Sequence, residues 1–539
     1  MKRNEDMSRL TILAINAKYV HSSLAAWVIA SGVREYAQKT HEVSIVEATI
    51  HHSNEEITER IAAHMPDVVG ISTYIWNAGK LPELMALIKE RLPGVRIIMG
   101  GPEAAYNAQF WLSRGAEHVL TGDGEYEVPA WLDGRDGDYE PYGSDRHDGS
   151  YEPRHPVPCF PGDEYIRALE GRLAYIETSR GCPFSCAFCL SADTSVRFFP
   201  MEMVKEQLTK LSKSGARTIK LVDRTFNCHR ERAYEIFEYV ISLGTECCFH
   251  FEVAADLFDE KTLNLLKTAA PGRIQFEAGL QSFFGPTLEA SSRQTDLSAV
   301  ERNVSVLMSG GNIHMHVDLI AGLPYETLKE FRNSFERAYA LKAHTLQLGF
   351  LKLLHGSKLR SRAHELGIEY SQEPPYEIRR SPWLSPQDIE VLKQAENALQ
   401  HTYNKSRFLT SLEYVLRSSG LKPFELYHKI GIAAPNHGTD LPAYAGQIIE
   451  VCAELSGVEH STLLDHMAYD WMGMVKGKNM PAILRNTEAG RSGLIKVAEK
   501  NLGRKIRRDE ATVLLSGKGL YVDSEKRNPV TGLYEVYEL

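Results

Sequence analysis

The sequence has few cysteines for its length, which excludes one broad class of fold. Eight cysteines occur among 539 residues. Secreted proteins that depend on a disulfide framework are much richer in cysteine, so we expect no such framework. Three of the eight nevertheless fall within eight consecutive residues, at Cys182, Cys186 and Cys189. Clustering of this kind in a large chain indicates a metal or redox site.

Long apolar runs and an excess of positive charge are missing too. No stretch approaches the roughly 20 apolar residues of a transmembrane helix, and no apolar signal core follows the N-terminal residues 1–6. We therefore expect no membrane contact and a cytoplasmic location. The formal net charge of −9 makes nucleic acid an unlikely partner, because neutralising phosphates requires a basic surface.

What is present indicates a globular protein of more than one domain. Hydrophobic residues make up 43% of the chain and charged residues 24%, and the length exceeds that of one ordinary domain. Residues 8–130 alternate short apolar strands with helical patterns, which predicts an α/β domain with a doubly wound, Rossmann-like parallel sheet. The expected strands are residues 10–15, 43–47, 67–72, 96–99 and 118–121.

The loops that follow these strands carry small and polar residues. Ligands of open α/β sheets bind at the carboxyl ends of the strands, and glycines there let the backbone approach a ligand. Each loop alone would be read as an ordinary tight turn, but four such loops together predict a binding crevice. The loops begin at Asn16, Ser72, Gly100 and Gly122.

The rest of the chain divides into three parts. Residues 131–170 are rich in Asp, Gly, Pro and Tyr and lack apolar periodicity, so they are predicted to be a linker. Residues 171–355 predict a partial (β/α)6 barrel, whose active site would lie at the C-terminal strand ends. Beyond residue 385 the pattern is mainly helical. We predict domains at 1–135, 171–384 and 385–539, with a linker at 136–170. The expected barrel strands are residues 173–178, 218–222, 250–253, 274–278, 314–320 and 345–351.

The spacing Cys182-x-x-x-Cys186-x-x-Cys189, directly after a predicted strand, is the strongest chemical signal. Three thiolates can hold a 4Fe-4S cluster and leave one iron open. Two alternatives remain. A structural zinc site would need a fourth ligand, which His250 or Cys228 could supply only through the fold. An electron-transfer ferredoxin would normally show a fourth cysteine nearby.

This run, with Phe188 before the last cysteine, resembles the signature of the radical S-adenosylmethionine (SAM) superfamily. The resemblance implies that Cys182, Cys186 and Cys189 are catalytic cluster ligands, and that the open iron binds SAM. Reductive cleavage of SAM would then give a 5′-deoxyadenosyl radical. It places Asp223 at the SAM amino group, Glu252 at the ribose and Arg293 at the carboxylate. The full set of implied SAM-binding residues is Phe188, Asp223, Glu252, Glu277, Gln281, Arg293 and Gly322.

The first 130 residues resemble the cobalamin-binding domain fused to many radical SAM enzymes, on segments 67–72, 97–103 and 121–125. Many cobalamin proteins use an Asp-x-His-x-x-Gly loop, and this motif is absent after the first strand. His21 in that loop is read as a loop residue, with cobalt ligation as the alternative. The implied cobalamin-binding residues are Asn16, Ser72, Thr73, Tyr74, Asn77, Gly100, Gly101, Pro102, Glu103, Gly122, Gly124 and Glu125.

Three functions follow from these resemblances. The first is a cobalamin-dependent methyltransferase acting on an unactivated carbon or phosphorus of an unknown substrate, with an electron donor such as a flavodoxin or ferredoxin. The second is a non-methylating cyclase or rearrangement enzyme with the same cofactors. The third, a non-catalytic module that binds cobalamin or haem, is disfavoured by the intact cysteine motif. No cysteine precedes Cys159, so the second cluster of a methylthiotransferase is not expected.

Overall fold

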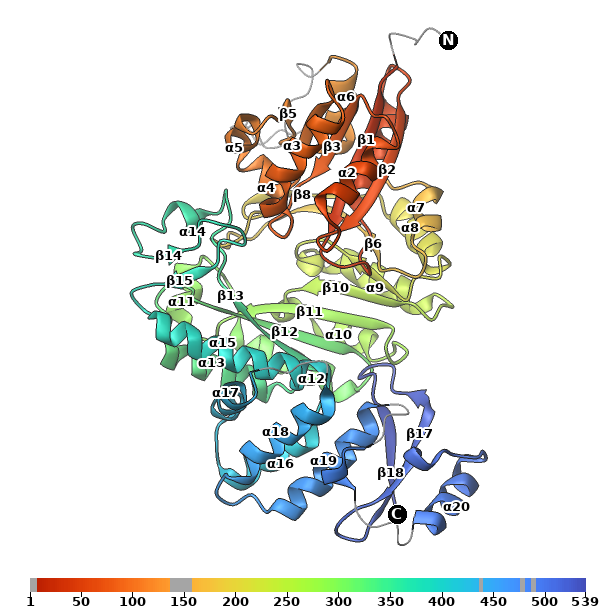
Figure 1. Ribbon diagram of the computed structural model, residues 1–539, viewed down its shortest axis with the longest axis vertical. Helices are drawn as coiled ribbons and strands as arrows, with labels where there is room; N and C mark the ends of the chain where they lie inside the picture. The colour runs from red at the N-terminus through yellow and green to blue at the C-terminus, as the bar shows by residue number, and fades with distance from the viewer. Residues whose placement is uncertain (1–6, 136–157, 436–439, 476–479, 486–490) are drawn as a thin grey trace. The chain divides into compact units, whose positions relative to one another are not determined.

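The computed structural model describes residues 7–135, 158–435, 440–475, 480–485 and 491–539 (Figure 1). The chain divides into two compact units. The first unit comprises residues 1–253, 291–294 and 351–379, and the second comprises 254–290, 295–350 and 380–539.

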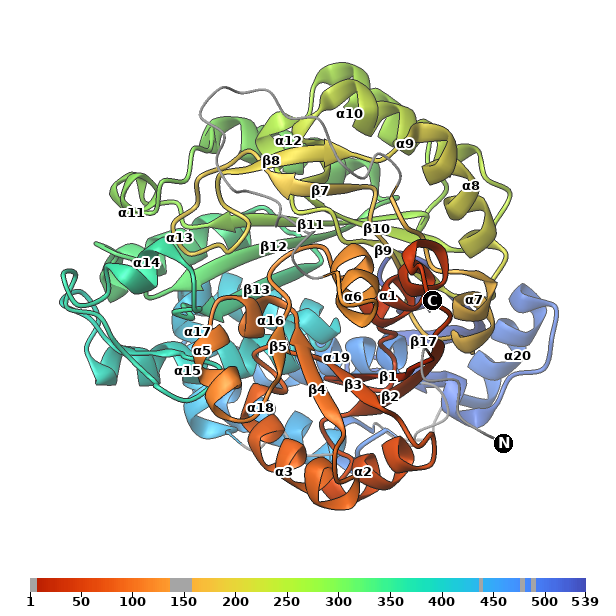
Figure 2. The ribbon, with the colours of Figure 1, turned by 90° about the horizontal axis from the view of Figure 1, so that it is seen from above.

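The first unit begins with a five-stranded parallel sheet in the order β2-β1-β3-β4-β5. This confirms the doubly wound N-terminal fold. Figure 2 shows α1 and α6 on one face of the sheet and α2 and α3 on the other. The strands are β1 (Arg9–Asn16), β2 (Glu42–Thr49), β3 (Val68–Ser72), β4 (Arg96–Gly100) and β5 (His118–Val119). The helices are α1 (Leu24–Tyr36), α2 (Asn54–Ala62), α3 (Leu81–Arg91), α4 (Pro102–Ala105), α5 (Ala108–Ser113) and α6 (Gly124–Leu132).

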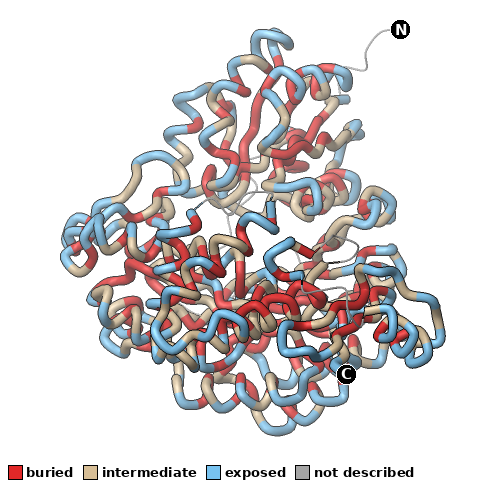
Figure 3. The backbone as a smooth tube through the Cα atoms, turned by 60° about the horizontal axis from the view of Figure 1, so that its bottom comes forward, coloured by how far each residue is buried: buried red, intermediate tan, exposed pale blue. Residues whose placement is uncertain are grey.

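Strand β1 shows why this sheet carries a helix layer on each face. Successive side chains of a strand point to opposite faces. Leu13 and Ile15 pack in the apolar cluster that includes residues of α2 and α3. Leu10 and Ile12 pack in the cluster that includes residues of α1 and α6. The continuous apolar run is therefore buried on both sides, as in other parallel sheets, and Figure 3 shows such buried strands in red.

The rest of the first unit contains three parallel strands and an antiparallel hairpin. Strands β6, β9 and β10 pair in parallel, with Tyr175, Lys220 and His250 in one row. The β7–β8 hairpin follows β6 and was not expected, and α7 lies in the range predicted as linker. The remaining linker residues 136–157 lie outside the described residues. The elements are α7 (Asp163–Ala168), β6 (Ala174–Ile176), β7 (Ser179–Cys182), β8 (Thr194–Phe198), α8 (Met201–Ser212), β9 (Thr218–Leu221), α9 (Arg230–Ser242), β10 (Cys248–Val253), α14 (Lys358–Ser361), β14 (Glu369–Tyr370) and β15 (Ile378–Arg380).

The second unit starts with three parallel strands, β11 (Ile274–Gln281), β12 (His314–Ala321) and β13 (Thr345–Phe350). Within the second unit the strand order is β13-β12-β11, and with β6, β9 and β10 of the first unit all six expected barrel strands are present. The helices that accompany the second unit's strands are α10 (Glu260–Leu266), α11 (Gly285–Ala290), α12 (Leu297–Gly310) and α13 (Leu328–Ala340).

The C-terminal region of the second unit is mainly helical, as predicted, and ends in a three-stranded antiparallel sheet. Its helices are α15 (Pro386–His401), α16 (Leu409–Ser419), α17 (Pro423–Ala433), α18 (Leu441–Ala453), α19 (His460–Met474) and α20 (Arg491–Leu502), and its strands are β16 (Ala511–Val513), β17 (Gly519–Arg527) and β18 (Tyr534–Glu538). Short 3₁₀ turns are η1 (Ala78–Lys80), η3 (Phe226–Cys228), η4 (Ala255–Leu257), η5 (Tyr403–Lys405), η6 (Ala482–Leu484) and η7 (Arg508–Glu510). Among the described helices, we find none with the length and apolar character needed to cross a membrane.

Gly32 sets the distance between α1 and α6. A Cβ atom on Gly32 would lie 2.2 Å from the backbone oxygen of Glu125. We expect Gly32→Ala to destabilise the first unit by about 1–3 kcal/mol, because the crowded helices must move apart. Thermal unfolding followed by circular dichroism measures the change. Gly244→Ala is the control, since a Cβ there has nothing within 4 Å. Equal unfolding temperatures for the two variants would contradict this account of the packing.

Candidate functional site

The cysteine motif lies on the β7–β8 hairpin and the loop between its strands. Cys182 ends β7, and its backbone N–H donates to Thr194 Oγ1 at 2.9 Å. Gly181 has φ +102°, and a Cβ there would lie 2.2 Å from the backbone oxygen of Ser195, so only glycine fits. The Cys182 and Cys186 side chains are buried, and Cys189 is half-buried. The hairpin thus holds the three cysteines in a defined loop.

The donor set around the motif is three cysteines. A structural zinc site normally has four protein ligands, whereas three cysteines suffice for a 4Fe-4S cluster with one open iron. Within the described ranges, no group of three or more His, Cys, Asp or Glu side chains is placed to hold one metal ion. The three cysteines therefore fit the cluster in number and residue type.

Each of the three sulfur atoms has a donor beside it. Thr225 Oγ1 lies 3.7 Å from Cys182 Sγ, Arg293 Nη1 donates to Cys186 Sγ at 3.4 Å, and the Ser191 N–H donates to Cys189 Sγ at 3.4 Å. Burial raises the pKa of the Cys189 thiol, and the other two cysteines raise it further. On metal binding the thiol would lose its proton, and the positive charge of the iron would stabilise the thiolate that forms.

Asp223 holds the segment that enters the cysteine hairpin. Its side chain is 1% exposed. Oδ1 accepts from the hydroxyls of Thr178 at 2.7 Å and Ser179 at 2.5 Å, and Oδ2 accepts from the Thr178 N–H at 3.0 Å. Burial outweighs these donors and raises the pKa of Asp223 to about 6. Because both oxygens are engaged within the protein, the geometry indicates that Asp223 positions β7.

The loops at the carboxyl edge of the N-terminal sheet are joined by buried amide groups. Asn77 Oδ1 accepts from the Tyr74 N–H at 2.9 Å, and its Nδ2 donates to the Ser72 oxygen at 2.9 Å and the Ile15 oxygen at 3.3 Å. Asn77 therefore connects the ends of β1 and β3.

The loops after β3 and β4 also meet directly. The Thr73 N–H donates to the Gly100 oxygen at 2.7 Å. Gly101 has φ +98°, and a Cβ there would lie 2.6 Å from the Thr73 oxygen. Backbone therefore approaches backbone closely at this edge, and glycine is required at 101 by the protein's own packing; the crevice stays a prediction. Pro102 begins α4 directly after these glycines.

A tryptophan that sequence reasoning missed, Trp76, lies at the same edge beside the predicted residue Tyr74. Tyr74 and Trp76 stack with ring centroids 4.2 Å apart and an angle of 7° between their planes. Trp76 is 47% exposed, and its Nε1 donates to the Ile15 oxygen at 2.9 Å. The signal in the sequence was a tryptophan directly before Asn77 in a strand-end loop.

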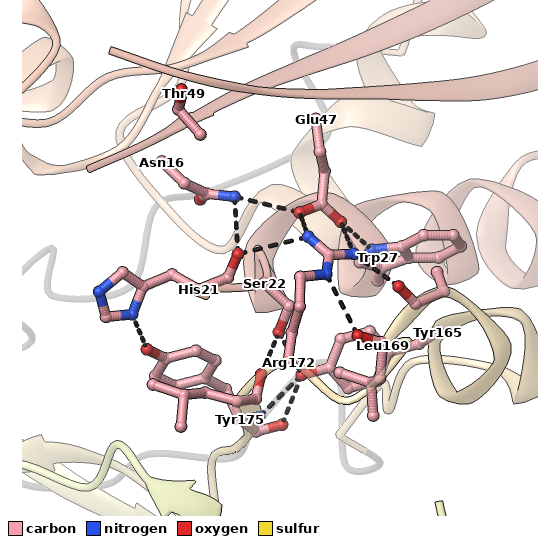
Figure 4. A network of polar contacts seen from close by, with 12 residues as sticks. Asn16, His21, Ser22, Trp27, Glu47, Thr49, Tyr165, Leu169, Arg172 and Tyr175 are labelled. Carbon is pink, nitrogen blue, oxygen red and sulfur yellow. Dashed lines mark hydrogen bonds and ion pairs between the residues drawn. The ribbon is translucent and has the colours of Figure 1, made fainter. Parts of the chain in front are cut away.

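The loop after β1 is tied to the start of β6 by a polar network (Figure 4). Arg172 Nη1 forms an ion pair with Glu47 Oε2 at 2.7 Å, and Asn16 Nδ2 donates to the same oxygen at 3.1 Å. His21 Nδ1 lies 2.6 Å from the Tyr175 hydroxyl. Burial lowers the pKa of His21, as do nearby lysines, so the ring is neutral near pH 7. Asn16 therefore lies in the predicted crevice loop, with its amide engaged in this network.

Arg180 connects the cysteine hairpin to the loop after β5. Its guanidinium pairs with Glu177 at 2.6 Å, with Glu125 at 2.9 Å and with Asp123 at 2.5 Å. Arg197 on β8 also pairs with Asp123, at 2.7 Å. Burial raises the pKa of Glu125. For Asp123 the two arginines outweigh burial and lower the pKa. Gly122 and Gly124 flank Asp123 in this loop.

Residues 351–379 of the first unit contact both groups of loops. The Tyr376 hydroxyl donates to the buried Glu103 carboxylate at 2.6 Å. The Leu359 N–H donates to the Ala187 oxygen in the cysteine loop at 2.8 Å. Burial raises the pKa of Glu103. This segment therefore fixes the loop after β4 and the cysteine loop together.

Three family models match the chain in succession. Residues 10–132 match the B12 binding domain, residues 176–338 match the radical SAM superfamily, and residues 364–504 match a family of unknown function, DUF4080. The first match covers the N-terminal sheet, and the second covers the cysteine hairpin and the parallel strands from β9 to β12. The chain is a radical SAM protein with a B12-binding domain.

Relatives of this radical SAM protein agree with that result. The cobalamin-dependent radical SAM methyltransferase TokK of Streptomyces tokunonensis is 26% identical over 357 residues, which cover 60% of this chain and 49% of TokK. The chain spans about half the length of the curated relatives it matches first.

Two solved structures share the fold. The methyltransferase TsrM of Kitasatospora setae has a TM-score of 0.54 at 18% identity, over 72% of this chain and 82% of TsrM. The cobalamin-dependent radical enzyme OxsB has a TM-score of 0.58 at 14% identity, over 86% of this chain and 78% of OxsB.

The predicted SAM-binding residues of this radical SAM protein fall in both units. In the first unit Phe188 lies in the cysteine loop, Glu252 lies half-buried on β10, and Arg293 contacts Cys186. In the second unit Glu277 lies on β11, Gln281 has φ +75° beside a bulge, and Gly322 has φ +98° after β12. Their contacts with SAM stay predictions, as do the cobalamin contacts.

A buried carboxyl group follows Gly322 in the second unit. Glu326 is fully buried, and its Oε1 accepts from Ser282 Oγ at 2.5 Å and Ser334 Oγ at 2.9 Å. Burial raises the pKa of Glu326 to about 7. The group anchors the loop after β12 to β11 and α13.

Glu326 predicts a pH-dependent stability. Its folded pKa lies above the value near 4.5 of an exposed glutamate, so its contribution to stability is lost as pH rises from about 4.5 through 7. Over that range we expect the free energy of unfolding to fall less for Glu326→Gln than for wild type. The difference should be on the order of 3 kcal/mol, at 1.36 kcal/mol per pKa unit. Unfolding temperatures between pH 5 and 8 test this. Glu390→Gln, on an exposed part of α15, should follow wild type. Parallel curves for Glu326→Gln and wild type would refute the assignment.

Arg180 predicts a large effect on stability. Arg180→Met would leave the buried carboxylate of Glu125 without its arginine and Asp123 with Arg197 alone, and breaking a buried ion pair in this way typically costs about 3–5 kcal/mol. Denaturation of the metal-free protein in urea gives the change. Arg91→Met removes an exposed pair with Glu59 and should unfold with wild type. If the two variants unfold alike, Arg180 does not join the loops.

Proposed function

We propose that the protein is a cobalamin-dependent radical SAM methyltransferase that methylates an unactivated carbon or phosphorus of its substrate. One observation carries the proposal: Arg180 and Arg197 bind the loop after β5 of the B12-binding domain to the hairpin that holds the cysteines. In this proposal the cobalamin site and the cluster site would lie next to each other within one compact unit, and these ion pairs support that placement.

The cysteines and the loops have separate tasks in this proposal. Cys182, Cys186 and Cys189 would hold the cluster and leave one iron open for SAM. When bound, the cluster, SAM and cobalamin would supply reductive radical formation and a transferable methyl group. Tyr74 and Trp76 would give an apolar face for the corrin ring, and Gly100, Gly101 and Pro102 would line its site in the loop after β4. Asp223 would orient β7.

Two comparisons support the cofactor set. TsrM was solved with cobalamin and a 4Fe-4S cluster bound, and OxsB with aqua-cobalamin and SAM bound. TokK is named as a cobalamin-dependent radical SAM methyltransferase. An electron donor such as a flavodoxin or ferredoxin would reduce the cluster. We place the protein in the cytoplasm, because thiols stay reduced there.

The domain limits 1–135, 171–384 and 385–539, with the linker 136–170, belong to the same proposal. The matches to the B12-binding and radical SAM families, at 10–132 and 176–338, lie inside the first two ranges and support them. The third range overlaps the match at 364–504.

Product analysis tests the proposed activity. The anaerobically reconstituted protein is incubated with SAM, cobalamin and a strong reductant, and small molecules are quantified by mass spectrometry. We expect 5′-deoxyadenosine, and S-adenosylhomocysteine that depends on cobalamin. The variant with Ala at Cys182, Cys186 and Cys189 should bind no cluster iron and cleave no SAM. Cys228→Ala is the matched control and should keep both properties.

The other outcomes are equally informative. If 5′-deoxyadenosine forms and S-adenosylhomocysteine does not, even with cell extract as a substrate source, the protein is a non-methylating enzyme. If neither product forms although the protein binds cobalamin, it is a binding module. Cleavage of SAM by the triple cysteine variant would contradict the role of the hairpin.

A further inference from the structure

The three cysteine sulfurs differ in the kind of donor beside them. Cys189 Sγ receives a backbone N–H at 3.4 Å, and Cys182 Sγ lies 3.7 Å from the Thr225 hydroxyl. Cys186 Sγ receives Nη1 of Arg293 at 3.4 Å. Among these three donors the guanidinium alone carries a full positive charge. Hydrogen bonds that involve a charged group are roughly twice as strong as neutral ones.

Arg293 is brought to Cys186 by a loop that docks on the cysteine loop. The Ala187 N–H donates to the Ser291 oxygen at 2.9 Å. Ser291 is fully buried, and Ser292 has φ +52°. Residues 291–294 belong to the first unit, whereas the helices on either side of them, α11 and α12, belong to the second. The loop therefore packs with the cysteines rather than with its own neighbours in the chain.

We propose that Arg293 is a positioning residue that raises the reduction potential of the cluster. The inference rests on the proposed function, in which Cys186 is a cluster ligand. One-electron reduction makes the cluster one charge more negative, with the electron supplied by the external donor. A guanidinium on a ligand sulfur stabilises that added charge, and hydrogen bonds to sulfur are a known determinant of cluster potential.

A second role for Arg293 predicts a different measurement. If the guanidinium binds the SAM carboxylate and does not affect the cluster, its removal weakens SAM binding and leaves the potential of the SAM-free cluster unchanged. If it acts through Cys186, the potential falls before any SAM is added. The two roles are thus separated by a titration without SAM.

The experiment is a redox titration of the reconstituted full-length protein, without SAM, followed by electron paramagnetic resonance of the reduced cluster. We expect Arg293→Gln to titrate at a more negative potential than wild type, with Arg293→Lys between them. Thr225→Val removes the neutral donor at Cys182 and should give a smaller negative shift. Arg224→Gln is the charge control: Arg224 acts electrostatically on Cys189 but is exposed, so solvent screens it and the shift should be smaller than for Arg293→Gln.

Each result decides something. An Arg293→Gln potential equal to that of wild type overturns the inference, and weakened SAM binding by the same variant then assigns Arg293 to SAM. Equal shifts for Arg224→Gln and Arg293→Gln also overturn it, because the sulfur contact would then have no special effect. If Arg293→Gln assembles no cluster, Arg293→Lys decides, with a potential equal to wild type overturning the inference. A wild-type protein without cluster iron would overturn the proposed function itself, before any variant is compared.

Discussion

The arrangement of the first unit depends on one half-buried guanidinium. Arg180 lies beside Gly181 and Cys182 at the start of the cysteine hairpin, and its charge is balanced by Glu177, Glu125 and Asp123. A charge removed from water is tolerated only where it is paired and hydrogen-bonded. The pairing here uses carboxylates from two different parts of the first unit, the turn before β7 and the loop that begins α6. This requirement ties the hairpin to the loop after β5, together with the ion pair of Arg197 and Asp123.

This constraint changes how the polar residues of the strand-end loops are understood. From the sequence, Asn77, Glu103, Glu125 and Asp223 are all expected to contact a cofactor. In the structure their side chains hold Tyr74, Tyr376, Arg180 and Thr178, respectively. An unsatisfied buried polar group is costly, so a buried carboxylate or amide needs such partners. These four side chains therefore shape the loops, and their contacts with a cofactor stay predictions.

The parts of the fold that could be predicted from the sequence are those whose pattern lies within a few neighbouring residues. The strands of the N-terminal sheet are apolar runs buried on both faces, as in β1, so composition and length identify them. The β7–β8 hairpin was missed because residues 179–182 read Ser-Arg-Gly-Cys, with no apolar alternation, and because their conformation depends on the positive φ of Gly181. Strand β17 was missed because Asp523, Glu525 and Lys526 interrupt its pattern.

The candidate site was predictable in its residue types and not in its pairings. The spacing of the three cysteines is local in sequence, so the motif could be identified directly. Arg180 and its partners Asp123 and Glu125 are separated by 57 and 55 residues, and sequence spacing carries no signal for such a contact. Arg293 is 107 residues from Cys186. Its presence near the motif was expected from the resemblance, but its contact with sulfur depends on how the 291–294 loop packs.

The loop after β1 also depends on contacts between residues that are far apart in the sequence. It contains a histidine, a residue type that binds cobalt in other proteins. His21 has one ring nitrogen within 2.6 Å of the Tyr175 hydroxyl, and its backbone forms a β-bridge with Leu173. The same loop is fixed through Asn16 to the ion pair of Glu47 and Arg172. These contacts connect the N-terminal sheet to β6, which leads to the cysteine hairpin. These contacts fix the loop within the protein, so the missing Asp-x-His-x-x-Gly motif is consistent with a loop whose task is to join the two sheets.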